Sequence, residues 1–436
     1  MQRCFLAHII AALVSVAVPS YAGEPERFSA ELLPPVKIQA NGRPLDVGRS
    51  GHAAPYFADV DGDGRRDLLV GQYADGRLRL YRNNGTNKAP RFGSFEYVLA
   101  GGQPASVPVY CCIGFTPQLV DLDGDGRLDL LSGSAPGETY WFRGGADKTF
   151  AAGEKLVDAD GKEITPGSIA TAFAVDWDSD GRLDLVLGNV MGEVHLARNM
   201  SSGGKLRFEQ PQKIDLSDPR EDKRDSGPVA ADWDGDGRFD LVVGMEDGSV
   251  YWFHNDGELG RPAFSAGMCL VPASPLAARS DDARGPHDCG QRTKVCVADY
   301  NDDGRPDLLV GDMGGWTHSK PEQTPAEVIE EQEADAALPQ LRTEWVEAYA
   351  AFRKLAANAA NSDQVDGDAK SKTDGGLKAH RDKLLARVTD LKTKIDAAES
   401  IVKRYEPQQQ THGYVCVFLR KSANGKKGEP LTASAE

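Results

Sequence analysis

Hydrophobic and polar positions follow one pattern five times along the chain: an apolar stretch, a loop rich in Asp and Gly, and a second apolar run. In the first copy, residues 53–58 precede the loop and residues 68–70 follow it. A continuous apolar run of this kind is typical of a strand covered on both faces. A Gly-containing turn then leads to an alternating strand at residues 78–82, and a weaker strand is expected to open at Phe92. The pattern predicts about four antiparallel strands in each repeat and no amphipathic helix, which are the features of a β-propeller blade.

The Asp loops are the most regular part of the repeat. They start at Asp59, Asp121, Asp176, Asp232 and Asp299, so successive copies are 62, 55, 56 and 67 residues apart. Fixed periods of this length indicate repeated structural units, and five copies predict five blades. A seven-bladed propeller is the alternative, but it requires two blades without the motif, and no residues remain to form them.

The two ends of the chain are expected to complete the ring together. Residues 28–47 resemble the fourth-strand segment of the repeats, and residues 413–420 resemble a third strand that is detached from its repeat. If these segments pair, the last blade is built from both ends and no sheet edge is left exposed. The prediction is an all-β, five-bladed β-propeller formed by residues 28–321 and 408–421.

The spacing of acidic residues within each loop predicts a calcium site. Ca²⁺ takes about six to eight oxygen ligands at roughly 2.3–2.6 Å. Asp side chains at loop positions 1, 3 and 5 converge if the loop curls, and the glycine at position 6 permits the sharp turn through positive φ. The backbone carbonyl of the arginine at position 7 and the carboxylate at position 9 would complete the shell. The predicted ligands are Asp59, Asp61, Asp63, Arg65, Asp67, Asp121, Asp123, Asp125, Arg127, Asp129, Asp176, Asp178, Asp180, Arg182, Asp184, Asp232, Asp234, Asp236, Arg238, Asp240, Asp299, Asn301, Asp303, Arg305 and Asp307.

An EF-hand and a simple hairpin turn fit the loops less well than this calcium site. An EF-hand requires a bidentate Glu at position 12 and flanking helices, whereas position 12 here is Val, Ser or Leu and the flanks are strand-like. Asp-Gly hairpin turns need no ion, but the nineteen motif carboxylates would repel one another without a cation. Five bound calcium ions would change the net charge from −16 to −6. Asn301 replaces one carboxylate in the fifth loop, which should therefore bind calcium most weakly.

The Asp loop followed by Asp-Leu-Leu-Val-Gly resembles the FG-GAP or VCBS repeat of the integrin α-subunit N-terminal propeller and of many bacterial secreted proteins. The resemblance covers residues 28 to about 317 and 411–421. It implies calcium at the Asp loops, although members of the family usually have seven blades. Known family functions include adhesion, lectin activity and polysaccharide lyase activity, and the repeat alone does not choose among them.

Residues 322–407 are rich in Ala, Glu, Lys and Gln and predict an antiparallel α-helical hairpin inserted into the last blade. Apolar side chains recur at three- and four-residue spacing over positions 338–355 and every seven residues over 377–405, with a polar linker at 358–376. Pro339 is expected to start or kink the first helix. Either the two apolar seams pack on each other or on the propeller, or the hairpin is an arm that contacts a partner protein or a second copy.

Residues 1–22 are expected to be a secretory signal peptide. Arg3 precedes a short apolar stretch at 5–18, and Ser20 and Ala22 provide the small residues of a cleavage site. The stretch is shorter than the about 20 apolar residues of a membrane anchor, and no later segment is long and apolar enough to span a bilayer. At the other end, residues 422–436 are polar, rich in Lys and Gly, and expected to be disordered.

Removal of the signal peptide leaves six cysteines, an even number that allows disulfides in an exported protein. Cys269 and Cys289 bracket a loop rich in Pro, Ser and Asp and are the first choice for a pair. Cys111 and Cys112 either form a vicinal bridge or remain two thiols.

Charge and motifs narrow the function. A net charge of −16 argues against nucleic acid as a partner, and the chain has no zinc-protease, serine-hydrolase or phosphate-binding motif. His52 is expected to be a surface or turn residue. Aromatic residues near strand ends on the face opposite the Asp loops either stack on sugar rings or belong to the blade core; they are Phe57, Tyr73, Phe115, Tyr140, Trp141 and Trp316.

The expected protein is a secreted, periplasmic or cell-surface propeller that is stabilised by calcium and acts as a binding or adhesion module. Its expected partner is a glycan or an extracellular protein. A polysaccharide lyase or hydrolase built on the propeller, and a purely structural scaffold, are the alternatives.

Overall fold

The computed structural model describes residues 29–48, 50–111, 113–202, 205–216, 224–225, 227–258, 260–274, 289–319, 323–361, 370–406 and 408–422. These residues fall into two compact units, one formed by the described parts of 29–314 and 412–422 and the other by those of 315–411. The predicted signal peptide lies outside the described residues, as do residues 423–436 of the predicted tail.

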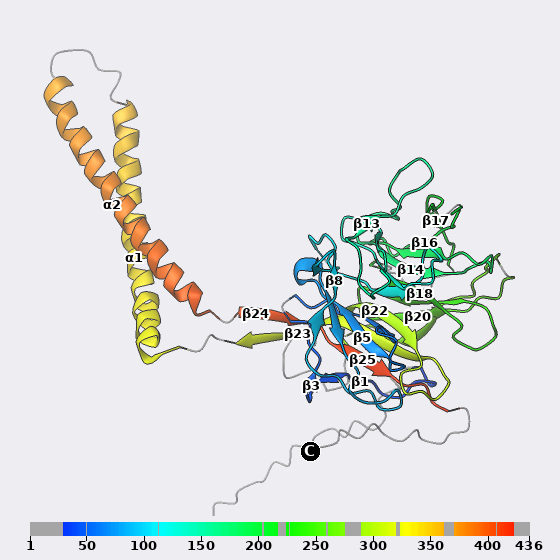
Figure 1. Cartoon of the computed structure of the whole chain (residues 1–436). Coiled ribbons are helices and arrows are strands. Elements are labelled where there is room, and N and C mark those ends of the chain that lie inside the picture. Colours follow the sequence, from blue (N-terminus) through cyan, green and yellow to red (C-terminus); the bar gives the residue numbers. More distant parts are fainter. Residues whose placement is uncertain are drawn as a thin grey trace, which may run out of the picture. The chain divides into compact units, whose positions relative to one another are not determined.

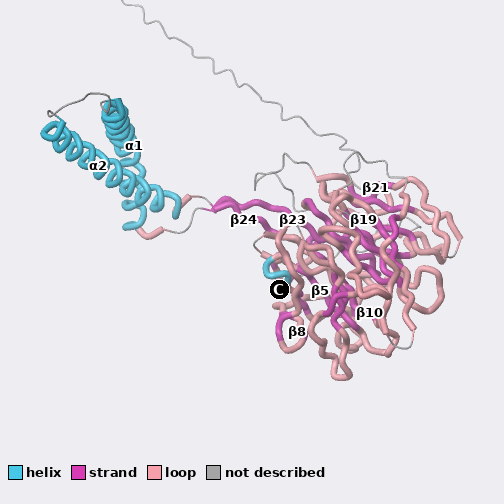
Figure 2. Tube along the Cα trace, turned by 90° about the horizontal axis from the view of Figure 1, so that it is seen from above, coloured by secondary structure: helices cyan, strands magenta, loops and turns pink. Residues whose placement is uncertain are grey.

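The first unit is built from five antiparallel sheets, each with at least four strands (Figures 1 and 2). Blades one to four each use consecutive strands of the chain, and the fifth uses strands from both ends. From the first strand outward, blade one consists of β4 (Ala54–Ala58), β5 (Asp67–Gly71), β6 (Leu78–Tyr81) and β7 (Glu96–Tyr97), and blade two of β10 (Gln118–Val120), β11 (Asp129–Ser132), β12 (Tyr140–Phe142) and β13 (Glu154–Lys155). Blade three consists of β14 (Thr171–Val175), β15 (Asp184–Gly188), β16 (Val194–Ala197) and β17 (Gln212–Lys213), and blade four of β18 (Gly227–Ala231), β19 (Asp240–Gly244), β20 (Val250–Phe253) and β21 (Met268–Val271). Blade five consists of β22 (Gln291–Ala298), β23 (Asp307–Ser319), β25 (Val415–Phe418) and β1 (Val36–Lys37).

Three smaller pairings supplement the blades. β24 (Gln408–His412) pairs with β23, β2 (Gln39–Ala40) pairs with β3 (Arg43–Pro44), and β8 (Leu99–Ala100) pairs with β9 (Gln103–Pro104). A short 3-10 turn, Ala74–Gly76, joins β5 to β6.

The first strands of the blades form a closed inner ring. β4 contacts β22 and β10, β14 contacts β10 and β18, and β18 contacts β22. Residues of β4, β14, β18 and β22, together with Thr116 and Pro117 just before β10, line a central cavity of about 120 Å³. Within the described residues, the ring confirms the prediction of five blades.

The fifth blade is completed by both ends of the chain. β1 pairs with β25, with Val36 opposite Val417, and β25 pairs with β23, with Val417 opposite Leu309. The sheet order β1-β25-β23-β22 therefore confirms that the N-terminal segment pairs outside the C-terminal strand.

The second strand of a blade is apolar throughout because it is covered on both faces. In β5, Leu68 packs in a cluster with Leu309 of blade five, whereas Leu69 packs in another cluster with Leu119 of blade two. Both leucines are 0% exposed. Alternate side chains of one strand thus belong to two blade interfaces, which confirms the interpretation of the continuous apolar runs.

The phenylalanines expected to open the fourth strands lie before those strands. Phe92 precedes β7 and bridges Asn83 of its own blade and Ala40 of β2. Phe150 and Phe208 make the corresponding bridges to Ala100 and Asp158. These residues therefore connect the outer part of each blade to the segment that leads into it.

The second unit contains α1 (Pro325–Asn361) and α2 (Lys370–Arg404), which run antiparallel (Figure 1). Thr324 precedes α1 as a cap: its hydroxyl accepts the N–H of Glu327 at 3.4 Å, and the Glu327 carboxylate accepts the N–H of Thr324 at 2.8 Å. This reciprocal arrangement satisfies two N–H groups at the helix start. α1 begins at Pro325, so Pro339 lies inside the helix and does not start it.

The apolar seams of the hairpin pack on each other. Leu338 of α1 shares a buried cluster with Ile395 of α2, and Ala348 of α1 shares another with Leu391. Leu377 is 42% exposed, so the predicted seam of α2 does not extend to that residue. The hairpin therefore satisfies its own seam, one of the two alternatives that the pattern left open.

The predicted Cys269–Cys289 disulfide is wrong, because both cysteines are free. Cys269 is exposed on β21 of blade four, whereas Cys289 is buried before β22 of blade five. A hydrogen bond with Cys416, together with burial, raises the pKa of the Cys289 thiol well above its usual value. Cys112 lies outside the described residues, so the alternatives for Cys111 and Cys112 stay open.

Candidate metal centres

Each Asp loop connects the first strand of a blade to the second, and its first aspartate holds the loop together. In the first loop, Asp59 accepts the N–H groups of Asp63 at 3.1 Å and Gly64 at 2.9 Å. The first aspartates of the other four loops accept the N–H groups of positions 5 and 6 in the same way. The glycine at position 6 has φ between 83° and 89° in all five loops, as the turn requires.

Predicted ligands converge in four of the loops. In loops one and three, carboxylate oxygens of positions 1, 3 and 5 lie within 4.8 Å of one another, and in loop two those of positions 1, 3 and 9 do. In loop four, carboxylate oxygens of positions 3 and 5 lie within the same distance of a histidine nitrogen. The groups are Asp59, Asp61 and Asp63; Asp121, Asp123 and Asp129; Asp176, Asp178 and Asp180; and Asp234, Asp236 and His254.

The donor set of these loops fits calcium. Carboxylate oxygens are hard ligands that suit this ion. Two loop oxygens, Asp67 Oδ2 and Asp178 Oδ1, are buried and accept no hydrogen bond from the described residues. Asp67 Oδ2 has only an ion pair with Arg82 at 3.7 Å. A buried carboxylate oxygen without a hydrogen bond is unfavourable, and a cation would provide a closer partner.

The aspartates at position 9 have a second role that the spacing did not reveal. Asp67, Asp129, Asp184, Asp240 and Asp307 are all at most 3% exposed. One oxygen of each accepts the backbone N–H of the second residue after the third strand, for example Gly144 N–H to Asp129 at 2.6 Å. Burial raises the pKa of these carboxyls, to about 6 for Asp307. They connect the loop to the third strand of the blade.

The arginines at position 7 pair with the carboxylates at position 5. The N–H of Arg65 donates to Asp63 at 2.8 Å, and the Arg65 guanidinium binds the same carboxylate. This contact lowers the pKa of Asp63. The other four loops have the same pair. The predicted role of the arginine carbonyl as a ligand remains a prediction.

A basic residue after the third strand also reaches the loops. Arg82 pairs with Asp61, Arg143 with Asp123 at 2.8 Å, and Arg198 with Asp178 at 3.0 Å. Sequence analysis missed these residues, although they recur 22 or 23 residues after the first aspartate of the loop. Arginine thus offsets part of the loop charge, and the expectation that only a bound ion does so was too strong.

The fifth loop differs from the others at its third position. The Asn301 amide donates to Asp303 Oδ2 at 3.1 Å, and Asn301 Oδ1 accepts the N–H of Asp303 at 3.2 Å. One carboxylate is therefore replaced by an amide that itself bonds to a neighbouring ligand. The weaker calcium binding of this loop remains a prediction.

The aromatic residues expected on the face opposite the Asp loops are largely part of the blades. Phe57 and Phe115 are 5% and 0% exposed and lie in the core, and the side chain of Trp316 is outside the described set. His52 has a φ of 59° at the end of a turn, one of the two expected positions, but it is buried and not at the surface, and its ring lies 5.5 Å from that of Tyr73. Burial, with the charges of Lys294 and Arg292, lowers its pKa to about 3.

A family model described as FG-GAP-like repeat matches residues 121–187, 176–243 and 232–310. Each match begins at an Asp loop and ends in the strand after the next loop. Residues 121–310 are FG-GAP-like repeats. Each match thus contains the Asp loop and the second, third and fourth strands of one blade, followed by the first strand, the Asp loop and most or part of the second strand of the next.

Further comparisons give more distant similarities. No protein of curated function matches the sequence. Among solved structures, an Agrocybe aegerita lectin described as recognising non-reducing terminal N-acetylglucosamine is 18% identical, with a TM-score of 0.32. The match covers 61% of this chain and 64% of the lectin chain. BBS1N in complex with ARL6DN is 13% identical, with a TM-score of 0.28, over 68% of this chain and 71% of that chain. Neither of the described helices is long and apolar enough to cross a membrane.

Proposed function

We propose that this FG-GAP propeller is a secreted module whose Asp loops bind calcium and whose surface binds a glycan or an extracellular protein. The observation that carries the calcium part is the convergence of loop carboxylates, with buried oxygens of Asp67 and Asp178 left without a hydrogen bond from the described residues. Positions 1, 3, 5 and 9 and the carbonyl of position 7 would hold the ion.

Calcium would stabilise the blades by neutralising the loops. The loop carboxylates carry like charges close together, and a divalent cation converts their repulsion into attraction. The buried aspartate at position 9 would transmit this effect to the end of the third strand, because it also accepts the N–H of the second residue after that strand. At a calcium concentration ten times Kd, each filled site stabilises the folded state by about 1.4 kcal/mol.

The calcium proposal is tested by metal analysis and thermal unfolding of the full chain. We expect about five calcium ions per chain from the five loops, and a melting temperature that falls in EDTA. The double variant D176N/D178N should lose one ion. The matched control D75N changes an exposed aspartate outside the loops and should lose none. An unchanged melting temperature in EDTA, with no bound calcium, would overturn the proposal.

The binding part rests on the propeller scaffold and on the central cavity. The described residues that line the cavity include no Asp or Glu, so the pair of carboxylates that a glycosidase requires is not found among them. We expect binding without cleavage on a glycan array, together with no depolymerisation of acidic polysaccharides. Depolymerisation would support the enzyme alternative, and no binding to glycans would leave an extracellular protein as the partner.

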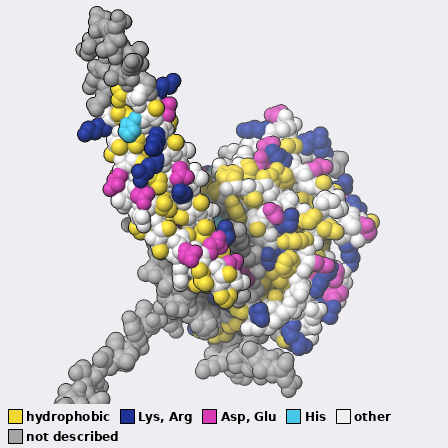
Figure 3. All heavy atoms as spheres, turned by 90° about the vertical axis from the view of Figure 1, so that its left-hand side faces the viewer, with side chains coloured by type: hydrophobic (Ala, Val, Ile, Leu, Met, Phe, Trp, Pro, Cys, Tyr) yellow, Lys and Arg dark blue, Asp and Glu magenta, His cyan; other side chains and the backbone are white. Residues whose placement is uncertain are grey.

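The helical hairpin is proposed as a protein-contact arm. Hydrophobic side chains are exposed among charged ones along it (Figure 3), including Ile329, Val346, Tyr349 and Leu385. We expect the variant lacking residues 322–407 to keep its calcium-dependent melting and to lose any self-association, measured as mass in solution. An unchanged oligomer would exclude the hairpin as the dimerising element.

A further inference from the structure

The fourth FG-GAP loop has a different basic partner from the first three. After the third strand, blades one to three place Arg82, Arg143 and Arg198 against the loop, whereas blade four places His254 there. A guanidinium has only N–H donors and remains charged, so it does not ligate a metal. A neutral imidazole nitrogen is a common metal ligand.

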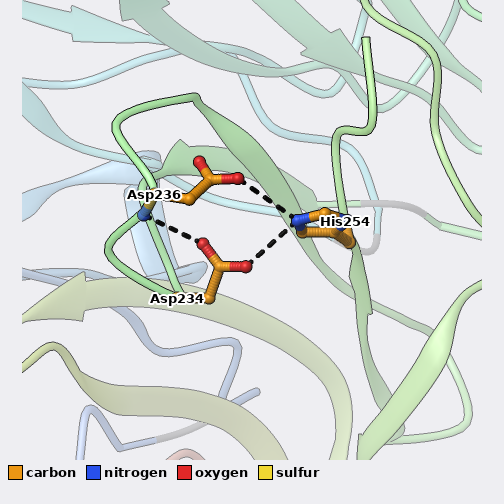
Figure 4. A group of neighbouring side chains, drawn as sticks. All are labelled: Asp234, Asp236 and His254. Carbon is orange, nitrogen blue, oxygen red and sulfur yellow. Dashed lines mark hydrogen bonds and ion pairs between the residues drawn. The ribbon is translucent and has the colours of Figure 1, made fainter.

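The distances between the three side chains match those around a transition-metal ion. His254 Nε2 lies 3.0 Å from Asp234 Oδ2 and 3.4 Å from Asp236 Oδ2 (Figure 4). Two ligand atoms each at a zinc-like bond length of about 2.1 Å are about 3.0 Å apart in octahedral geometry and about 3.4 Å apart in tetrahedral geometry. The two distances from His254 thus match those between ligands of one ion, and ligand atoms of all three side chains lie within 4.8 Å of one another.

The remaining atoms of these residues are held in the orientation that metal binding requires. His254 Nδ1 lies 3.0 Å from Asp256 Oδ1, so Asp256 can hold the Nδ1 proton, whereas Nε2, which faces the carboxylates of the loop, must give up its proton when it binds a metal. Asp234 Oδ1 accepts the N–H of Asp236 at 3.2 Å, which directs Oδ2 towards His254. Asp236 Oδ2 also pairs with Arg238, so the metal would compete with that arginine.

The group is accessible from solvent. Asp234, His254 and Asp256 line a cavity of about 340 Å³ together with Trp252, Ser265 and Met268. The side chains of Asp234, Asp236 and His254 are 25% to 29% exposed. A hydrated ion can therefore reach the three ligand atoms and keep water as its remaining ligands.

We propose that Asp234, Asp236 and His254 form a site for a transition-metal dication of the zinc class, oriented by Asp256. The site uses two carboxylates of the fourth loop that the proposed function gives to calcium, so the two ions would compete there, but it does not depend on calcium binding at the other four loops. The imidazole favours Zn²⁺, Co²⁺ or Ni²⁺ over Ca²⁺, which prefers oxygen ligands.

The test is titration of the untagged full chain with Zn²⁺ by calorimetry and with Co²⁺ by visible absorption, first without calcium and then with saturating calcium, which should compete for Asp234 and Asp236 and weaken the binding. We expect one site per chain and a Co²⁺ spectrum that depends on His254. H254R, which introduces the residue found in blades one to three, should abolish it. D256N should weaken it by about 10- to 100-fold. H380Q changes an exposed histidine on α2 and should change nothing.

Two further arms show which residues bind the metal. The exposed thiol of Cys269 could itself bind zinc, so the titration is repeated with C269S, which should bind as the unmodified chain does. Calcium content, measured separately, reports on the calcium function alone. Zinc binding that is equal in H254R and the unmodified chain, or that disappears in C269S, overturns the proposal.

Discussion

Asp312 and Tyr414 form two hydrogen bonds with each other across the helical insertion. The N–H of Tyr414 donates to Asp312 Oδ1 at 2.8 Å, and the N–H of Asp312 donates to the Tyr414 carbonyl oxygen at 3.0 Å. The two residues are 102 positions apart in the chain. Asp312 Oδ2 also accepts the N–H of Gly290. One buried carboxylate therefore holds together the segments that lead into β22 and β25 and the strand β23.

Replacing this carboxylate should destabilise the closed propeller. D312A leaves the N–H groups of Gly290 and Tyr414 without their acceptor, and each buried unsatisfied group costs about 1–3 kcal/mol. We expect a loss of about 2–4 kcal/mol in the free energy of unfolding, measured with urea. The control D215A removes an exposed aspartate and should change it by less than about 0.5 kcal/mol. A loss in D312A no larger than in D215A would contradict a role in closure.

The last glycine of the repeated Asp-Leu-Leu-Val-Gly is required by the next blade. A Cβ atom at Gly71 would lie 1.7 Å from the carbonyl oxygen of Phe115, and at Gly133 1.9 Å from that of Ala170. G71A should therefore push two blades apart and lower the free energy of unfolding by about 3 kcal/mol or more. In α2, a Cβ at Gly376 would meet no atom within 4 Å, so G376A should be neutral or stabilising by up to about 1 kcal/mol. Equal effects of the two substitutions would exclude close approach as the reason.

Substitutions of the aspartates at positions 3 and 9 of one loop should lower the free energy of unfolding in ways that depend differently on calcium. Asp129 is 0% exposed and accepts N–H groups from Gly144 at 2.6 Å and Leu122 at 3.1 Å. D129N turns an amide donor towards one of these donors and should cost about 2–4 kcal/mol, in EDTA as well as in calcium. D123N should act mainly on the stabilisation that calcium adds. Unfolding of both variants with and without calcium checks this, and a D129N effect that vanishes in EDTA would contradict the structural role.

Local patterns were sufficient to predict most of the fold. The five copies of the Asp loop predicted five blades, and the alternating segment near residue 415 predicted the closing strand. Both signals are patterns of side chains within a few consecutive residues, which the sequence shows directly. The seams of the hairpin were predicted for the same reason. Leu377 is the exception, since the regular spacing continues beyond the point where the two helices still cover each other.

Contacts between distant segments were not predictable in the same way. Cys289 forms a hydrogen bond with Cys416 and does not pair with Cys269, because the closed ring brings the segments that carry Cys289 and Cys416 together. The spacing of the cysteines in the sequence does not indicate this contact. Arg82 in blade one and His254 in blade four pair with carboxylates of their Asp loops because the third strand of each blade ends beside the loop. The burial of His52 accompanies a contact of its ring with Tyr73, which lies just after β5, and local sequence does not indicate that contact.

His52 should make the propeller sensitive to mild acid. Its pKa is about 3 in the folded protein, against 6.5 for an exposed histidine, because of burial and the charges of Lys294 and Arg292. Protonation therefore favours the unfolded chain. The contribution of neutral His52 is fully present above pH 6.5 and is lost as the pH falls from 6.5 towards 3. At about pH 5 the loss should be about 2 kcal/mol relative to about pH 7.5.

The variant H52N isolates this effect, because asparagine suits the φ of 59° at this position and does not titrate. Urea unfolding at about pH 7.5 and about pH 5, in EDTA to remove any calcium contribution, should show a drop in stability about 2 kcal/mol smaller in H52N than in the unmodified chain. H380Q, at an exposed histidine, should retain the full drop. Removing a neighbouring positive charge with K294M should raise the pKa of His52 and reduce the drop partway. The same drop in H52N and in the unmodified chain would mean that His52 is not the acid-sensitive group.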